Sequence, residues 1–340
     1  MKLRLTFLSL LIFLMGCDEK SISIYVSPAG SDANTGEMNQ PVSSLTKAQN
    51  LVREVLASGY AGDISVIISD GLYNLDETLV LGLEDGGSAG QTIRWEAAPG
   101  AKPVISSSRV IKGWKKLEGS LPGLPEAAEG NVYVADLKGQ GPDDWKFKVL
   151  FDGETLLPRA RTIGFQPTEA CPTPTLANRW ENLKELKYPE GVIRDWENLS
   201  DVEIFIRPTH QWLVNYLTLE SVDEENLTAT TTLPGTYRLC KVKNKPWKET
   251  CWVENVLEGL DQPGEWVLNS ETGKLYLWPT NGQPGEQIQA PLLNTLVRVE
   301  GKNVYEVEGD VPVQGIQFKG LVFTGTDRDT WTTEDRGIQH

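Results

Sequence analysis

The sequence predicts an all-β protein in which coils of a β-solenoid lie at both ends of the chain and an antiparallel β-module is inserted between them. Short apolar runs alternate with polar residues between Gly, Asp and Pro turns at the N-terminal end, a pattern typical of strands. A middle segment rich in tryptophan breaks that rhythm, and the alternation returns at Val297. Thirty-two Gly and twenty Pro residues in 340 also fit many short strands and tight turns.

The first twenty residues predict export and lipid anchoring. Lys2 and Arg4 precede an almost wholly apolar run, residues 5–15, which is too short to cross a bilayer as a helix but suits a signal-peptide core. Leu14-Met15-Gly16-Cys17 then resembles the bacterial lipobox. We expect a signal peptide over residues 1–16 and acyl chains on Cys17 that hold the protein in the lipid bilayer of the cell envelope. The membrane face, periplasmic or outer surface of the outer membrane, stays open. The alternative is an ordinary signal peptide with an incidental cysteine.

Three further cysteines, Cys171, Cys240 and Cys251, are available for structural roles. A compartment beyond the inner membrane permits disulfides. Cys240 and Cys251 flank the short segment 241–250 and can face each other across a hairpin, so we predict a Cys240–Cys251 disulfide, with two reduced buried thiols as the alternative. No Cys or His spacing typical of a metal site occurs in the sequence, and no metal is expected.

One amphipathic helix is predicted near the N-terminus. Residues 22–26 read as a first strand, and apolar residues then recur at helical spacing over residues 44–56, with Ser43 or Ser44 as N-cap. Such a helix needs an apolar surface to cover, and it is well placed to close the open end of a stack of coils. The side chains expected to face the first coil are Leu45, Ala48 and Val52.

Four short β-rich runs follow the helix, each bounded by turn residues: 64–68, 78–81, 92–95 and 103–105. Their spacing is irregular, but the 27 residues from Val66 to Ile93, with a strand between, suit one coil of a solenoid. Parallel coils pair each strand with its successor, so we expect Ile67, Ile93 and Val104 to point inward in columns.

The middle of the chain runs from about Trp114 to Pro291 and carries, after Trp114 itself, eight of the eleven tryptophans. Residues 202–206, 217–219 and 228–232 read as strands of an antiparallel β-domain. From Leu296 the alternation of the first segment resumes.

Two groups of motifs carry a family resemblance. The first group contains Tyr25-Val26-Ser27-Pro28-Ala29-Gly30-Ser31-Asp32, Asp70-Gly71-Leu72-Tyr73, Ala97-Ala98-Pro99-Gly100, Gly113-Trp114, Phe151-Asp152-Gly153 and Leu157-Pro158-Arg159-Ala160-Arg161. It resembles the opening of secreted bacterial right-handed parallel β-helix proteins, which include glycoside hydrolases such as β-helical xylosidases, fucosidases and α-galactosidases. The second group, from Glu254 to Pro279, resembles the β-sandwich or barrel module that relatives insert between early coils.

The resemblance implies a right-handed parallel β-helix with an N-terminal capping helix and an inserted antiparallel β-sandwich or barrel. The expected division after the signal peptide is N-terminal coils with the capping helix over 17–114, the inserted module over 115–291, and resumed coils over 292–340. Relatives continue for several further coils, and a solenoid needs a terminal cap. We therefore expect this chain to be an N-terminal fragment.

Candidate catalytic residues are carboxylates, because the sequence has two histidines and no serine-hydrolase, zinc-protease, phosphate-loop or dinucleotide motif. Glycosidic bonds are cleaved by paired carboxylates. The loop after residues 321–324 interleaves acids with arginines, and its candidates are Asp327, Asp329, Glu334 and Asp335, with Arg328 and His340 as substrate contacts. The alternative is a solvated, salt-bridged loop. In related β-helical glycosidases the catalytic acids lie on later coils, so the resemblance assigns no catalytic residue here.

His210 and Trp212 form a second candidate for substrate binding, in the inserted module. A tryptophan can stack on the apolar face of a sugar while a polar neighbour bonds a hydroxyl. The alternative is that the module's tryptophans anchor its core.

The resemblance implies a glycoside hydrolase that needs no cofactor and degrades an extracellular poly- or oligosaccharide. Its paired carboxylates would lie mostly beyond residue 340, so the fragment itself is expected to be inactive. A polysaccharide lyase, which uses a basic side chain or Tyr and often calcium, and a non-catalytic glycan-binding or surface protein are the alternatives. A net charge of −15 argues against nucleic acid as a partner.

Overall fold

The computed structural model describes residues 21–88, 90–172, 181–207, 213–241, 249–302 and 309–329. Strands dominate, which confirms the all-β prediction at this level, and the sheets are of both parallel and antiparallel kinds. The α-helix found in the described residues is α1 (Leu45–Ala57), and the 3-10 helices are η1 (Leu83–Asp85), η2 (Glu126–Ala128), η3 (Leu199–Asp201) and η4 (Leu257–Gly259). None of these helices is both long enough and apolar enough to span a membrane. The chain divides into two compact units.

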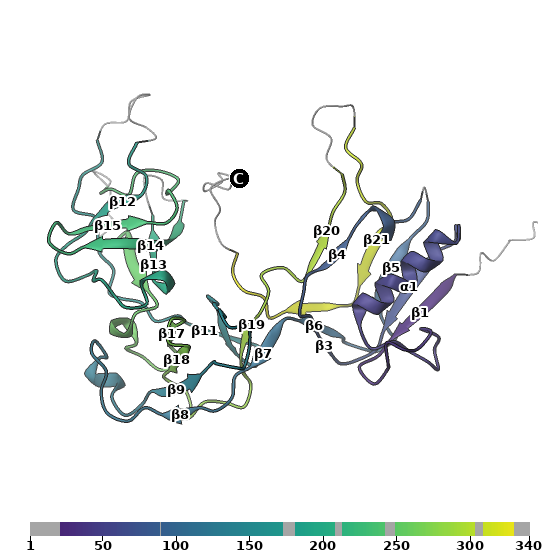
Figure 1. Cartoon of the computed structure of the whole chain (residues 1–340), viewed down its shortest axis with the longest axis horizontal. Coiled ribbons are helices and arrows are strands. Elements are labelled where there is room, and N and C mark those ends of the chain that lie inside the picture. The colour runs from purple at the N-terminus through teal and green to yellow at the C-terminus, as the bar shows by residue number, and fades with distance from the viewer. Residues whose placement is uncertain are drawn as a thin grey trace, which may run out of the picture. The chain divides into compact units, whose positions relative to one another are not determined.

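The first unit takes its described residues from 21–73, 78–105 and 297–323. Its largest sheet, in the order β1-β2-β5-β21, is parallel throughout (Figure 1). Its strands are β1 (Ile22–Val26), β2 (Ile64–Ile68), β5 (Ile93–Ala97) and β21 (Ile316–Lys319). Two smaller sheets are the parallel pair β20 (Val297–Val299) and β4 (Leu79–Leu81), and the order β22 (Val322–Thr324), β6 (Val104–Ser106), β3 (Leu72–Asn74). Strands from both ends of the chain therefore share sheets.

The register of the parallel sheet stacks apolar side chains in columns. Ile24, Val66 and Trp95 form one such column, and all three are buried. Ile93 is buried as expected, but the prediction was wrong by one residue for Ile67 and Val104, which are only half-buried. Because side chains alternate between the faces of a strand, burial of the even-numbered positions of β2 turns Ile67 to the other face.

The predicted helix is confirmed as α1, with Ser44 as its N-cap. The Ser44 hydroxyl accepts a hydrogen bond of 3.0 Å from the backbone N–H of Lys47. The expected side chains Leu45, Ala48 and Val52 are buried, and α1 lies beside β1 (Figure 1). On the same helix Arg53 donates two hydrogen bonds, of 2.7 and 2.8 Å, to the buried carboxylate of Asp85. The helix is thus held by apolar packing and by the ion pair of Arg53 with the buried Asp85.

The strands β20, β21 and β22 each end their sheet in the described residues. Their large apolar side chains are exposed, at 49% for Val299, 40% for Phe318, 43% for Val322 and 43% for Phe323. The rings of Phe318 and Phe323 contact each other edge to face, with centroids 6.0 Å apart. We call these three strands the β20–β22 edge.

The second unit takes its described residues from 74–77, 106–296 and 324–329, and it contains three antiparallel sheets. The first has the order β11 (Thr155–Leu157), β10 (Leu150–Asp152), β19 (Ile288–Pro291), β7 (Ser108–Val110). The second has the order β12 (Glu185–Lys187), β15 (Thr228–Thr231), β14 (Asn215–Asp223), β13 (Glu203–Ile206), β16 (Cys251–Glu254). The third has the order β17 (Trp266–Asn269), β18 (Lys274–Leu277), β9 (Tyr133–Asp136), β8 (Lys115–Lys116). The predicted strands near 202, 217 and 228 correspond to β13, β14 and β15.

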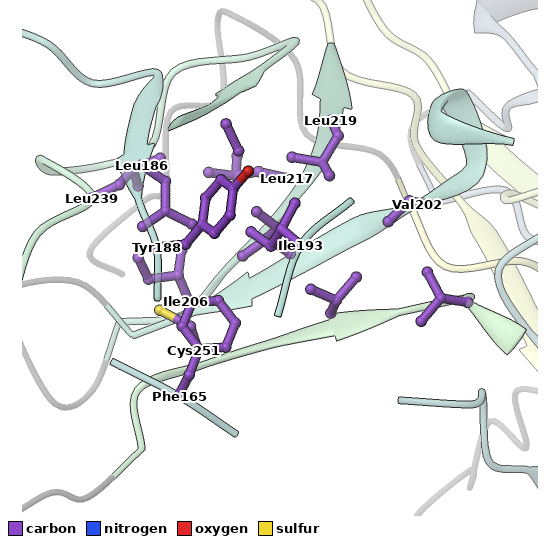
Figure 2. Close-up of a cluster of buried hydrophobic side chains, with 14 residues drawn as sticks. Phe165, Leu186, Tyr188, Ile193, Val202, Ile206, Leu217, Leu219, Leu239 and Cys251 are labelled. Atoms are coloured by element: carbon purple, nitrogen blue, oxygen red, sulfur yellow. The ribbon is translucent and has the colours of Figure 1, made fainter. Parts of the chain in front are cut away.

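The five-stranded sheet packs one face on a core of its own. Figure 2 shows this cluster, in which Ile206, Leu217 and Cys251 come from three adjacent strands. Alternation on β13 sends Ile204 and Ile206 into the core and turns Glu203 and Phe205 to the opposite face. That opposite face carries the candidate site.

Candidate functional site

The predicted site residues fall partly outside the described structure. Cys17, His210, Trp212, Glu334, Asp335 and His340 lie outside the described residues. Asp327, Arg328 and Asp329 are described, and they follow β22 in the part of the chain that belongs to the second unit.

Asp327 anchors its loop to the second unit. Its backbone N–H donates to the carbonyl of Leu293 at 2.8 Å, and its Oδ1 accepts a 2.8 Å hydrogen bond from the backbone N–H of Lys148. Burial raises the pKa of the Asp327 carboxyl, while hydrogen bonds from Lys148 and Arg328 partly oppose that shift. Asp329 instead accepts a 3.0 Å hydrogen bond from the side chain of Asn294.

Arg328 reaches from this loop to the outer face of the five-stranded sheet. Its Nη2 donates to Oε2 of Glu203, and its guanidinium lies 4.2 Å from the centre of the Tyr216 ring. A guanidinium over an aromatic face is attracted by the ring quadrupole. Arg328 is thus held by two neighbouring strands, by the carboxylate of Glu203 on β13 and by the ring of Tyr216 on β14.

Glu203 is the centre of this cluster, and sequence reasoning missed it. Its side chain is 2% exposed and contacts three cations: Arg159, Arg328 and, at 3.0 Å, Lys148. Burial alone raises the pKa of Glu203, but the charges of Arg159, Arg328 and Lys148 outweigh burial and lower the pKa to about 2. Glu203 is therefore an anion at neutral pH, where it binds the three cations and is not a proton donor.

Three aromatic rings form a row beside Glu203, which we call the aromatic row: Tyr216, Phe205 and Trp252. The register of β14, β13 and β16 places them directly opposite one another. Phe205 stacks on Trp252 with centroids 3.6 Å apart and meets Tyr216 edge to face at 5.2 Å. The indole N–H of Trp252 donates to Glu254 at 2.8 Å, which fixes the ring in its plane.

Arginines cover the outer rings of the aromatic row. Arg161 lies 5.0 Å from the Trp252 centroid, as Arg328 lies over Tyr216. A ring stacked at 3.6 Å leaves no room for a guanidinium between the partners, so Arg161 covers the face of Trp252 opposite Phe205. Both faces of Trp252 are occupied, and a sugar could stack on this ring only by displacing Arg161. The outer face of the five-stranded sheet therefore carries the guanidinium groups of Arg161 and Arg328.

A cavity of about 340 Å³ adjoins this face and shares Arg161 and Trp252 in its lining. Glu265, also in the lining, is buried and accepts hydrogen bonds from the backbone N–H groups of Asp261 and Gln262 at 2.9 and 3.1 Å. Burial raises the pKa of the Glu265 carboxyl. The cavity offers donors and acceptors for hydroxyl groups, and its lining includes Glu249 and Asp261.

A weak signal for this site was present in the sequence. Glu203 interrupts the otherwise apolar run Val202-Glu203-Ile204-Phe205-Ile206, and an acid in a buried strand requires a cationic partner. Arg159 and Arg161 stand two residues apart in Leu157-Pro158-Arg159-Ala160-Arg161, so they share one side of an extended segment. Only the fold shows that these two segments meet.

The predicted Cys240–Cys251 disulfide is wrong. The bridge joins Cys171 and Cys240, with Cα atoms 5.0 Å apart, and Cys251 is a buried free thiol. Backbone bonds between residues 169–171 and Lys241 bring Cys171 beside Cys240. On β16, Cys251 alternates inward to the core beside Phe165, away from that pair.

Comparison with known proteins gives a match of fold. No family model and no curated protein matches the sequence. A solved structure described as "Glycoside hydrolase" superposes with a TM-score of 0.66 at 22% identity, covering 90% of this chain and 51% of its own. A second, described as a complex of XylC with xylose, gives a TM-score of 0.39 at 15% identity, covering 90% of this chain and 35% of its own. The chain thus spans about half the length of the first structure and shares its fold over that part.

Proposed function

We propose that this chain is the N-terminal part of a glycoside hydrolase that acts on an extracellular poly- or oligosaccharide. The observation that carries the proposal is the shared fold with a protein described as a glycoside hydrolase, over 90% of this chain. That match extends over 90% of this chain and 51% of the other protein.

The first unit is proposed to be the opening coils of a right-handed parallel β-helix. Its support is the parallel pairing of each strand with the next in β1-β2-β5-β21 and the stacking of apolar side chains along them. The β20–β22 edge supports a further coil, because edge strands with exposed apolar side chains are a surface that another strand can cover.

The catalytic carboxylate pair is proposed to lie outside residues 1–340. Cleavage of a glycosidic bond needs two carboxyl groups about 5 to 9.5 Å apart around the bond. In the described residues Glu203 is held as an anion by three cations, Asp327 accepts a hydrogen bond from the backbone of Lys148, and Asp329 accepts one from Asn294. Their geometry favours a supporting role. Arg328, His340, His210 and Trp212 remain proposals for substrate contacts.

The experiment compares the protein expressed from its complete gene with the chain of residues 1–340. Both are incubated with aryl glycosides of xylose, fucose and galactose, and release of the aryl alcohol is measured. We expect turnover of at least one substrate by the complete protein and none by the shorter chain. Turnover by the shorter chain that Asp327→Asn or Asp329→Asn abolishes would place the site within the described loop. Unsaturated products without hydrolysis would indicate a lyase.

We also propose that Cys17 carries the lipid anchor, on the support of the lipobox-like sequence. Cells expressing the protein are fed radiolabelled palmitate. Label should enter the wild type and not Cys17→Ser, whereas equal labelling of both would contradict the anchor.

A further inference from the structure

A cavity of about 440 Å³ in the second unit has a lining with both aromatic and charged groups. We call it the Trp196 pocket. Trp196 packs against the core of the five-stranded sheet, whereas Leu121, Leu257 and Tyr276 pack against a separate cluster around Leu260. The pocket therefore lies between two cores of one unit, and its aromatic lining residues are Trp196 and Tyr276. Its charged lining residues are Arg194, Asp195, Glu197, Glu224 and Glu258.

Glu258 is held in a fixed position at this pocket. The indole N–H of Trp196 donates to its Oε2 at 3.1 Å, and Nη1 of Arg194 lies 3.5 Å from its Oε1. Gly123 leaves the space for this carboxylate, because a Cβ at that position would come within 2.7 Å of Oε1. Gly123 also has a φ of +86°, which favours glycine. Each carboxylate oxygen keeps a lone pair for a further donor.

Tyr276 adds a hydroxyl group to the pocket. Burial raises the pKa of Tyr276, so the hydroxyl stays neutral and can both donate and accept. The four acids outnumber the single arginine in the lining, and this charge balance repels anionic ligands. The pocket thus combines aromatic rings, carboxylate acceptors and a phenol.

We propose that the Trp196 pocket binds one ring of a neutral saccharide. Hydroxyl groups of a sugar would donate to Glu258 and form hydrogen bonds with the Tyr276 hydroxyl. The C–H face of the sugar ring would pack on the aromatic lining of the pocket. The negative lining selects against uronic acids. The choice of a saccharide rests on the proposed function, but the site would serve binding and has no part in bond cleavage. It would hold an extended glycan on the second unit.

The test measures binding of neutral xylo- and galacto-oligosaccharides to the chain of residues 1–340 by calorimetry and saturation-transfer NMR. We expect one neutral series to bind. Glu258→Gln should weaken that binding about tenfold, since a hydrogen bond to a charged acceptor contributes about 1.5 kcal/mol or more. Tyr276→Phe keeps the ring and should weaken binding less. Glu286→Gln, in the lining of another cavity, is the matched control and should leave the affinity unchanged.

Several outcomes would overturn the site. They are absence of binding by every neutral series, equal affinity of Glu258→Gln and wild type, or tighter binding of uronate oligosaccharides. Tighter binding of tetramethylammonium, which aromatic rings with carboxylates can also hold, would identify a cation site instead. The test measures binding and needs no turnover. The binding site can therefore be confirmed even if the complete protein proves not to be a hydrolase. Conversely, hydrolysis by the complete protein would not by itself confirm the binding site.

Discussion

Glu203 shows how one residue can hold together segments that are distant in sequence. Its carboxylate binds Lys148, Arg159 and Arg328, which come from three separate parts of the chain. Removing one partner of a buried ion pair leaves the others uncompensated. We expect Glu203→Gln to lower the free energy of unfolding by about 3 to 5 kcal/mol, measured by urea denaturation at pH 7. Glu220→Gln, an exposed position on the same sheet, should change it by less than about 0.5 kcal/mol.

The same carboxylate predicts a pH dependence. Its pKa falls on folding, from an ordinary 4.5 to about 2. The folded state therefore binds the proton less tightly than the unfolded chain, and stability from Glu203 is present above about pH 5 and lost as the pH falls toward 2. The loss is on the order of 3 kcal/mol. Urea denaturation between pH 6 and 3 should show a smaller decline for Glu203→Gln than for the wild type, and parallel declines would contradict this role.

The cysteines give a second residue-scale prediction. A peptide map without reduction should link the Cys171 and Cys240 peptides and leave Cys251 free. Burial raises the pKa of the Cys251 thiol to about 12, so native protein should resist iodoacetamide at pH 8 while unfolded protein reacts.

Cys240→Ser removes the disulfide and should lower the free energy of unfolding by about 2 to 5 kcal/mol. A Cys240–Cys251 link would show that the pairing is wrong.

These residues also show what spacing alone omits. Cys240 and Cys251 are close in sequence, yet strand alternation turns Cys251 to the core, and a pairing with residues 169–171 brings in a distant partner. The sequence shows Asp327 and Arg328 as part of a charged loop, but it does not indicate their partners Lys148 and Glu203. The composition of a loop is visible in the sequence, but the residues that the loop contacts depend on the fold.

At the scale of elements, α1 was predictable because its causes are local. The cap, the apolar spacing and the end of the helix all lie within residues 44–59. Ser44→Ala removes the acceptor for the Lys47 N–H and should cost about 1 kcal/mol. Chemical denaturation followed by far-ultraviolet circular dichroism checks this value. Ser58→Ala, at the other end of the helix, serves for comparison, and an equal effect there would remove the special role of Ser44.

The sequence predicts the strands of the first unit, but it does not predict which face of each strand is buried. Residues 64–68 are β-branched or small at every position, so apolar pattern alone does not say which side faces inward. The structure decides for Ile64, Val66 and Ile68 because these pair with Ile93, Trp95 and Ala97 in the next strand. Registers of this kind come from neighbours that are distant in sequence.

For the whole molecule, the β20–β22 edge predicts association of the 340-residue chain. Exposed strands with apolar side chains pair readily with another copy. Sedimentation velocity should show larger species as the concentration rises, and Phe318→Lys with Phe323→Lys should suppress them without changing the thermal midpoint. Ile163→Lys, an exposed apolar residue of the second unit, is the control. Persistence of the larger species in the double variant would assign association to another surface.

The sheet order of the second unit has a consequence for the order of folding. β7 and β19 are neighbours, and Ser107 and Leu293, 186 residues apart, are hydrogen-bonded beside them. In the first unit, Arg94 and Gln317 pair across β5 and β21 although 223 residues separate them. Closing the loop between β5 and β21 in an unfolded chain is costly in conformational entropy. If the second unit has already folded and its ends are joined at β7 and β19, the loop is effectively shorter. The entropic cost then falls by on the order of 1 to 2 kcal/mol. The antiparallel sheets should therefore assemble first and the β5–β21 pairing last. Pulse-labelled hydrogen exchange during refolding should protect amides of β13 and β14 before those of β21.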